Sequence, residues 1–252
     1  VYTPQQMANY RAFDIPSGND DPYVGLAAAY EVATTNPTIQ ADFDEMNVVY
    51  LGNYTSSTVL LACKEPVTAL SDLDGLKVRA NPPHADVFKA NGAVVVSMPF
   101  PEVYQALDTG IIDCAQTYWS AIFAFKHQEV AKNITALNWS QNMAFGLVMN
   151  KDSFERLSPE QQKVLREIGY DTTMLAAKLA IGSTKAIRER ILSDETVTLH
   201  TFDAENQAAL IQAGRDTAKS FKGDPAVLDA YLAAADKYEA VLADKGYPWA
   251  QN

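Results

Sequence analysis

The segment from residue 73 to residue 118 constrains the fold more than any other part of the chain. It alternates short β-branched runs with amphipathic stretches, in the order strand, helix, strand, helix, strand. Gly75 precedes the first strand, and Pro101 and Gly110 lie just inside the start and just past the end of the second helix. This alternation predicts a parallel sheet with ligand-facing residues at the carboxyl ends of its strands, and Arg79 lies at such an end.

The composition predicts which partners the protein does not have. Among 252 residues, 20 are Lys or Arg and 31 are Asp or Glu, which gives a net charge of -11. An acidic surface argues against nucleic acid and against anionic membrane surfaces. The apolar runs are shorter than the ~20 residues that cross a bilayer, so we expect no direct membrane insertion. No signal peptide opens the sequence, as expected for a mature or trimmed exported chain.

Three motifs in this order carry a resemblance to a known family. They are an Asp-Leu-x-Gly-Leu-Lys-x-Arg segment at 72–79, a Pro-x-x-Glu-Val-Tyr-x-Ala-Leu helix at 99–107, and a Gly-x-x-Asp turn at 110–113. Together they resemble the solute-binding proteins of tripartite ATP-independent periplasmic (TRAP) transporters. The resemblance implies an α/β fold of two lobes with hinge strands and a long bridging helix, a periplasmic location, a membrane permease as partner, and no cofactor.

The resemblance also implies a division of the chain into lobes. Lobe I is expected over 1–54 and 143–181, and lobe II over 55–142 and 182–220, with C-terminal helices at 221–252 packing back on lobe I. Relatives usually have further strand and helix units before the residue that is first here. The N-terminal part of lobe I is therefore expected to be missing from this chain.

A long helix is predicted after residue 157. Ser158 is a good N-cap, Pro159 suits the first helical position, and Gln161 completes a capping box. Apolar residues then recur at helical spacing for about 35 residues, roughly 50 Å. The stripe is not a strict heptad, so a helix across both lobes is favoured over a coiled coil, and Gly182 marks a place to bend. Other patterns predict a helix over 120–133, strands over 134–139, 144–150 and 197–202, and helices over 204–221 and 225–243.

Arg79 is the main candidate for ligand binding. In the family that it resembles, the arginine of this motif forms a two-pronged salt bridge to a substrate carboxylate, which a planar guanidinium matches. The alternative is an arginine paired with a neighbouring Asp or Glu. Asn81 lies on the same face of an extended segment and is expected either to bind the ligand or to cap the following helix.

Further contacts are transferred from the family residue by residue. Phe100 either packs a ring against the ligand or belongs to the core, and Thr117 and Tyr118 are expected to face the cleft. Many relatives carry a second arginine near Asn53 and Tyr54, and this chain has none there. These two side chains would be neutral substitutes, which favours a monocarboxylate with hydroxyl or aromatic groups over a dicarboxylate.

The cysteines and histidines do not suggest a metal site. Cys63 and Cys114 fall in predicted strands, where either a disulfide or two buried free thiols would be reasonable. His84, His127 and His200 are scattered and lack metal-ligand spacing. We therefore predict no metal.

The predicted function is capture of a small organic acid for a TRAP permease. The alternative is an α/β enzyme that acts on a small carboxylate metabolite. No Gly-x-Ser-x-Gly turn is present, and the paired carboxylates at 20–21 and 42–45 lie in polar stretches where they would be solvated. We therefore assign no catalytic residue.

Overall fold

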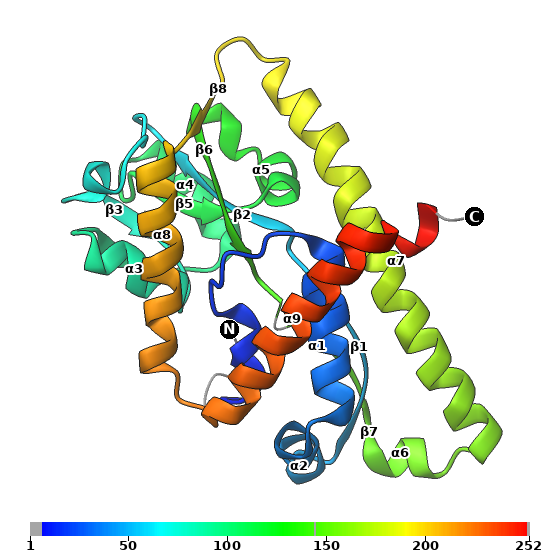
Figure 1. The fold of residues 1–252 in the computed structure, drawn as a ribbon. Coiled ribbons are helices and arrows are strands. Elements are labelled where there is room, and N and C mark those ends of the chain that lie inside the picture. The colour runs from blue at the N-terminus through cyan, green and yellow to red at the C-terminus, as the bar shows by residue number, and fades with distance from the viewer. Residues whose placement is uncertain (1–6, 144, 251–252) are drawn as a thin grey trace.

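The computed structural model describes residues 7–143 and 145–250 (Figure 1). Its strands are β1 (Val48–Tyr54), β2 (Thr58–Cys63), β3 (Lys77–Arg79), β4 (Val94–Val96), β5 (Cys114–Thr117), β6 (Asn133–Gln141), β7 (Phe145–Asn150) and β8 (Thr198–Thr201). Its α-helices are α1 (Pro22–Thr35), α2 (Pro37–Glu45), α3 (His84–Ala90), α4 (Phe100–Asp108), α5 (Trp119–Phe125), α6 (Lys151–Glu155), α7 (Pro159–Leu192), α8 (Ala204–Asp216) and α9 (Pro225–Lys245). Short 3-10 helices include η1 (Tyr10–Asp14), η3 (His127–Glu129) and η4 (Thr217–Ser220).

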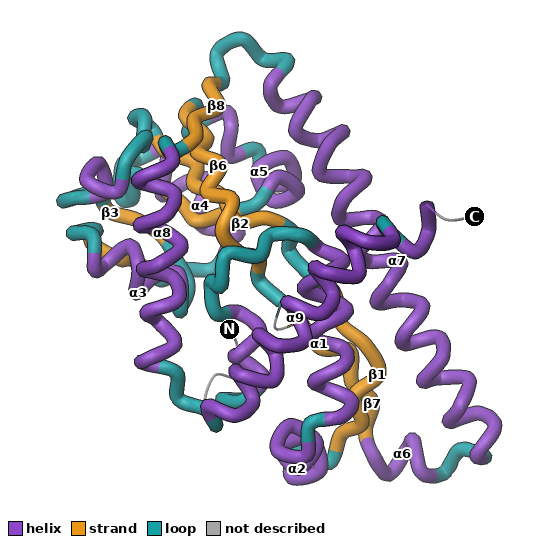
Figure 2. The backbone as a smooth tube through the Cα atoms, in the orientation of Figure 1, coloured by secondary structure: helices purple, strands orange, loops and turns teal. Residues whose placement is uncertain are grey.

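The strands form two separate sheets, which Figure 2 shows in orange. β1 and β7 pair antiparallel, and the other six strands follow the order β4-β3-β5-β2-β6-β8. The pairs β3–β4, β3–β5 and β6–β8 are parallel, whereas β2 is antiparallel to both β5 and β6. The predicted strand and helix alternation over 73–118 is confirmed. Its parallel strands belong to a larger mixed sheet because β2 inserts next to β5.

Each sheet has its own buried core. The side of the molecule with β1 buries mainly side chains of η1, α1, α2 and α9. The six-stranded sheet buries one core against α3 and α8 and another against α4, α5 and the end of α7. The structure is therefore an α/β fold in two parts, as the sequence predicted. The lobe boundaries in the sequence analysis remain a prediction.

Helix α7 contacts both parts and begins as predicted. The Ser158 hydroxyl accepts a hydrogen bond from the Gln161 amide, and the Gln161 side chain accepts one from the Ser158 amide. Gly169 faces β1 so closely that a Cβ there would lie 2.0 Å from the Leu51 carbonyl oxygen. Only a glycine allows the two backbones to touch in this way. The helix continues unbroken through Gly182.

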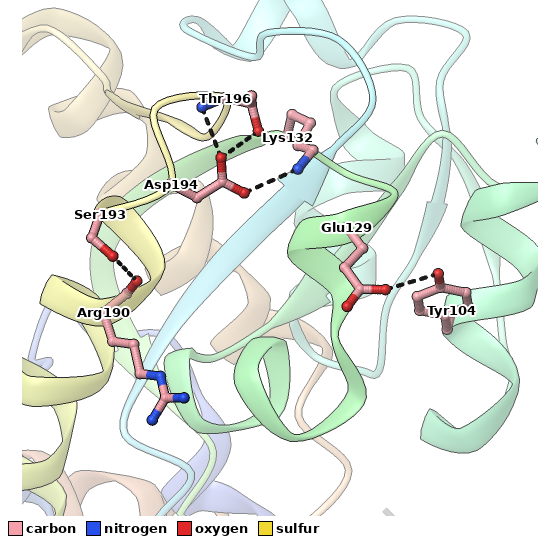
Figure 3. Close-up of polar contacts among 7 residues, drawn as sticks. All are labelled: Tyr104, Glu129, Lys132, Arg190, Ser193, Asp194 and Thr196. Atoms are coloured by element: carbon pink, nitrogen blue, oxygen red, sulfur yellow. Dashed lines mark hydrogen bonds and ion pairs between the residues drawn. The ribbon is translucent and has the colours of Figure 1, made fainter.

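The turn that follows α7 is held by short polar contacts, which Figure 3 shows. The Ser193 hydroxyl donates to the Arg190 carbonyl at 2.7 Å. The Asp194 carboxylate accepts from the Thr196 amide at 2.9 Å and hydroxyl at 2.6 Å, and pairs with Lys132 at 3.3 Å. Because Lys132 directly precedes β6, these contacts connect the end of α7 to the six-stranded sheet.

Two predicted helices end earlier than expected. The helix predicted over 120–133 is α5 followed by η3, because Lys126 adopts the left-handed conformation, with φ 57°, that ends α5. The helix predicted over 204–221 stops at Asp216 and continues as η4. The predicted strands and the last helix are confirmed within a few residues at their ends. Ala144, in the strand predicted over 144–150, lies outside the described residues.

Cys63 and Cys114 form a disulfide. They lie directly opposite each other on the antiparallel strands β2 and β5, with their Cα atoms 4.1 Å apart. The alternative of two free thiols is therefore wrong. The strand pairing that brings the cysteines together joins segments 51 residues apart, so no local sequence pattern indicated it.

Candidate ligand-binding site

Arg79 is buried at the carboxyl end of β3, between β4 and β5. Its side chain is held on several sides, and the residue is only 3% exposed. Nε donates to the Met98 carbonyl at 3.0 Å, and Nη1 donates to the Gln116 carbonyl at 3.4 Å. The guanidinium also lies over the ring of Phe100, 4.3 Å from its centroid. The loop after β4, strand β5 and the start of α4 therefore fix the direction of this cation.

An aromatic layer lies beside the guanidinium. Phe100 is half-buried at the first position of α4, with its centroid 5.5 Å from the ring of Tyr118 in an edge contact. It also stacks with Phe125 at 5.8 Å and with His127 at 6.2 Å. Such pairs stabilise one another beyond the area that they bury. We call the set the Arg79 cluster, and its members are Arg79, Phe100, Gln116, Thr117, Tyr118, Phe125 and His127.

Two buried polar side chains of β5 lack partners for part of their hydrogen-bonding capacity. The side-chain oxygen of Gln116 accepts a hydrogen bond from the backbone N–H of Asn81 at 2.8 Å, which fixes the orientation of the side chain. Its Nε2 has no partner among the described residues. Thr117 Oγ1 also has no hydrogen-bond partner among the described residues. Each residue is 1% exposed. An unsatisfied buried group costs about 1–3 kcal/mol, so these atoms indicate a place for a water or a ligand.

His127 adds a neutral polar group to the cluster. It is fully buried in η3, and neither ring nitrogen has a partner in the described part of the chain. Burial, and then the nearby charge of Arg79, lowers the pKa of His127 to about 4, so the ring offers one donor and one acceptor at neutral pH. The Tyr104 hydroxyl donates to the Glu129 carboxylate at 3.2 Å, and this hydrogen bond, drawn in Figure 3, connects α4 to η3.

Asn53 and Tyr54 lie near the end of β1 and have other contacts. Asn53 is fully buried. Its side-chain oxygen accepts a hydrogen bond from the Tyr50 hydroxyl at 2.7 Å, and its backbone N–H donates to Thr173 Oγ1 at 3.0 Å. Its Nδ2 has no partner among the described residues. Tyr54 is 46% exposed and stacks on Phe145 at 4.9 Å. In the described part of the chain, no hydrogen bond, ion pair or ring contact joins either residue to the Arg79 cluster.

Three members of the cluster were not predicted from the sequence: Gln116, Phe125 and His127. Gln116 could have been recognised as a second polar residue next to Thr117 in an otherwise apolar strand. His127 was considered only as a metal ligand, within a stretch that was expected to be helical. Its position beside Phe100 depends on the turn at Lys126, which gives no clear signal in the sequence. Among the described residues, no group of three or more His, Cys, Asp or Glu side chains could hold a metal ion.

The chain matches one known protein family. The profile of "Bacterial extracellular solute-binding protein, family 7" matches residues 23–224. The ectoine-binding periplasmic protein TeaA of Halomonas elongata is 30% identical over 173 residues, which cover 66% of this chain and 50% of that protein. The C4-dicarboxylate-binding periplasmic protein DctP of Rhodobacter capsulatus is 24% identical over 210 residues, covering 82% and 62%. The chain spans about half the length of the first curated relatives that it matches.

Solved structures share the fold over nearly the whole chain. The apo form of TeaA superimposes with a TM-score of 0.80 at 24% identity and covers 93% of this chain and 80% of its own. A marine metagenome TRAP solute-binding protein in complex with 3-hydroxybenzoate gives a TM-score of 0.82 at 25% identity, covering 94% and 77%. No helix of the described residues is both long and apolar enough to cross a membrane. The chain belongs to bacterial extracellular solute-binding protein family 7, the periplasmic solute-binding proteins of TRAP transporters, which are binding proteins and not enzymes.

Proposed function

We propose that the protein binds a small organic acid at the Arg79 cluster and delivers it to a TRAP-type membrane permease. The observation that carries the proposal is a buried guanidinium at the end of β3, next to strand β5, in which the side chains of Gln116 and Thr117 have buried polar atoms without partners among the described residues. A carboxylate would bind the guanidinium as a fork, and further oxygen atoms of the ligand would satisfy the neighbouring amide and hydroxyl. Relatives are named as binding proteins for ectoine, for C4-dicarboxylates and for aromatic acids, and these names support a small organic acid as the ligand.

The neutral and aromatic members of the cluster favour a monocarboxylate. A ring or an apolar chain of the ligand would pack on Phe100 and Tyr118, while Thr117 would bind a hydroxyl group. A second carboxylate near Asn53 and Tyr54 would be desolvated without a cation in either side chain, at a cost of several kcal/mol. We propose that Asn53 and Tyr54 contact the ligand from the β1 side only after the two lobes close, and that Asn81 contacts it from the β3 side.

Closure requires a hinge, and two crossing segments could supply it. The chain passes between the sheets at 55–57 and again after β6, at Asn142 and Met143. The Thr55 hydroxyl donates to Gln141 Oε1 at 2.9 Å, and the Ser56 amide donates to the Asn142 carbonyl at 3.1 Å. Because the two described crossings are hydrogen-bonded to each other, they would turn together when a ligand brings the lobes into contact.

A panel of organic acids tests the proposal. Thermal denaturation would be followed for the wild-type protein and for Arg79→Ala, with each acid added separately. A ligand at 100 times its dissociation constant adds about 2.7 kcal/mol to the free energy of unfolding. We expect at least one acid to raise the unfolding temperature of the wild type. The same acid at the same concentration should not raise that of Arg79→Ala. Mass spectrometry of the released compound should return it unchanged, whereas conversion to a product would contradict the binding role.

A further inference from the structure

A cavity of about 220 Å³ lies where three segments meet. The segments are η1 with the residues that flank it, the start of α3, and η4 with the residues that follow it. The first belongs to the part of the molecule with β1, the second to the part with the six-stranded sheet, and the third connects α8 to α9. No lining residue of the cavity belongs to the Arg79 cluster.

The charges that line this cavity are positive on balance. Arg11 and Lys222 contribute two positive charges and Asp86 one negative charge, so the sum is +1. Within residues 7–143 and 145–250, none of these three side chains makes a hydrogen bond or an ion pair. Arg11 is half-buried, and the other two are exposed. In a chain with a net charge of -11, a local excess of unpaired cations selects for an anion.

The rest of the lining is apolar and limits the size of what can enter. Ile15 and Pro83 are buried, and Phe221 is half-buried. These side chains would cover a compact hydrocarbon body, whereas a phosphate or sulfate ion has no apolar part to bury against them. The volume is below the 300–1,000 Å³ of pockets for drug-sized molecules, so only a small molecule fits.

We propose that this cavity is a second binding site, for a small monocarboxylate with a compact apolar or ring body. Arg11 forms the forked pair with the carboxylate because a half-buried guanidinium is less screened by water than an exposed ammonium. Lys222 contributes a weaker and more salt-dependent attraction from the rim. The apolar part of the ligand lies between Ile15, Pro83 and Phe221. This site rests on none of the contacts of the Arg79 cluster.

Benzoate is a suitable probe, and the Arg79→Ala protein removes the first proposed site. We expect saturable binding of benzoate to Arg79→Ala, measured by calorimetry and by shifts of the backbone amide signals of Ala8 and Ser220, which line the cavity. Adding Arg11→Gln should weaken binding tenfold or more. Adding Arg188→Gln, which removes an equal charge from an exposed position of α7, should leave the affinity unchanged. Benzyl alcohol, a neutral analogue, should bind at least tenfold more weakly than benzoate.

A variant that fills the cavity gives an independent check. Ala8→Leu keeps every charge but occupies part of the volume, so it should also abolish benzoate binding. Equal affinity in Arg11→Gln and in its control, or no saturable binding at millimolar benzoate, would overturn the proposal. If circular dichroism shows that Arg79→Ala is unfolded, the same amide signals can be followed in the wild-type protein and in Arg11→Gln.

Discussion

The guanidinium of Arg79 lies over the ring of Phe100, with 4.3 Å between its central carbon and the ring centroid. The contact joins the end of β3 to the first residue of α4. A cation over an aromatic face contributes about 2 kcal/mol or more when it is desolvated. It also covers one face of the planar fork, so that Phe100 and the two backbone carbonyls together determine how a carboxylate can approach Arg79.

Replacing Arg79 with Ala should weaken binding of the organic acid by roughly 2–5 kcal/mol, because the ligand carboxylate would be buried without its partner. Lysine should restore only part of the affinity, because an ammonium cannot form the fork. Isothermal calorimetry on the acid found in the thermal panel measures both effects, with Arg188→Ala as the control on α7. Unchanged affinity in Arg79→Ala would remove the central contact of the proposed site.

Monocarboxylates should bind more tightly than short dicarboxylates of similar size. The reason is the cost of desolvating a second carboxylate near Asn53 and Tyr54, several kcal/mol, which corresponds to a hundredfold or more in affinity. Competition between 3-hydroxybenzoate and succinate on one preparation would measure the preference. Tight binding of succinate would contradict it and would point to a further cation in the cleft.

Removing the disulfide should destabilise the protein. A bridge that closes a loop with a sequence separation of 51 residues is expected to contribute roughly 4 kcal/mol by restricting the unfolded chain. The double variant Cys63→Ala with Cys114→Ala should therefore unfold at a clearly lower urea concentration than the oxidised wild type. Reduction of the wild type should give the same change, and the double variant should not respond to the reductant.

Two glycines of α7 should respond in opposite directions to alanine. At Gly169 a methyl group would overlap the Leu51 carbonyl, so Gly169→Ala should cost about 3 kcal/mol or more. At Gly182 nothing lies within 4 Å of the added Cβ, so Gly182→Ala should stabilise the helix by about 0.5–1 kcal/mol. Urea denaturation of both variants is the measurement, and destabilisation of equal size would contradict the close contact between α7 and β1.

Acid should destabilise the protein through its buried histidines. Burial lowers the pKa of His84 from 6.5 to about 3, so below pH 6.5 the unfolded chain takes up a proton that the folded state does not. Stability is therefore lost as the pH falls from 6.5 toward 3, by at most about 1.4 kcal/mol per pH unit from this residue. Between pH 6.5 and 5, the free energy of unfolding should fall less steeply in His84→Gln than in the wild type, and the difference in slope is the contribution of His84. Parallel pH profiles would show that His84 is not the cause.

Local patterns predicted most of the elements but few of the contacts between them. The capping box at Ser158 and the alternation over 73–118 depend on near neighbours in the chain, so they could be predicted from the sequence. The partners of Cys63 and Gln116 could not, because both depend on strand pairings between distant segments. The left-handed residue Lys126 ended α5 early and placed His127 beside Phe100, and a lysine gives little warning of such a conformation.

The contact of Gly169 with β1 also determines where the molecule can bend. The backbone of α7 touches β1 at Gly169, and the Thr173 hydroxyl accepts a hydrogen bond from the backbone N–H of Asn53. The helix therefore cannot roll or slide on this strand without breaking both contacts. The first half of α7 and the β1–β7 sheet therefore form one rigid body. Any change in the angle between the two sheets must be taken up beyond Ile181, which still packs against the core on the β1 side. Because the helix continues to Leu192, a change of a few degrees there becomes a displacement of ångströms at the turn that anchors α7 to β6.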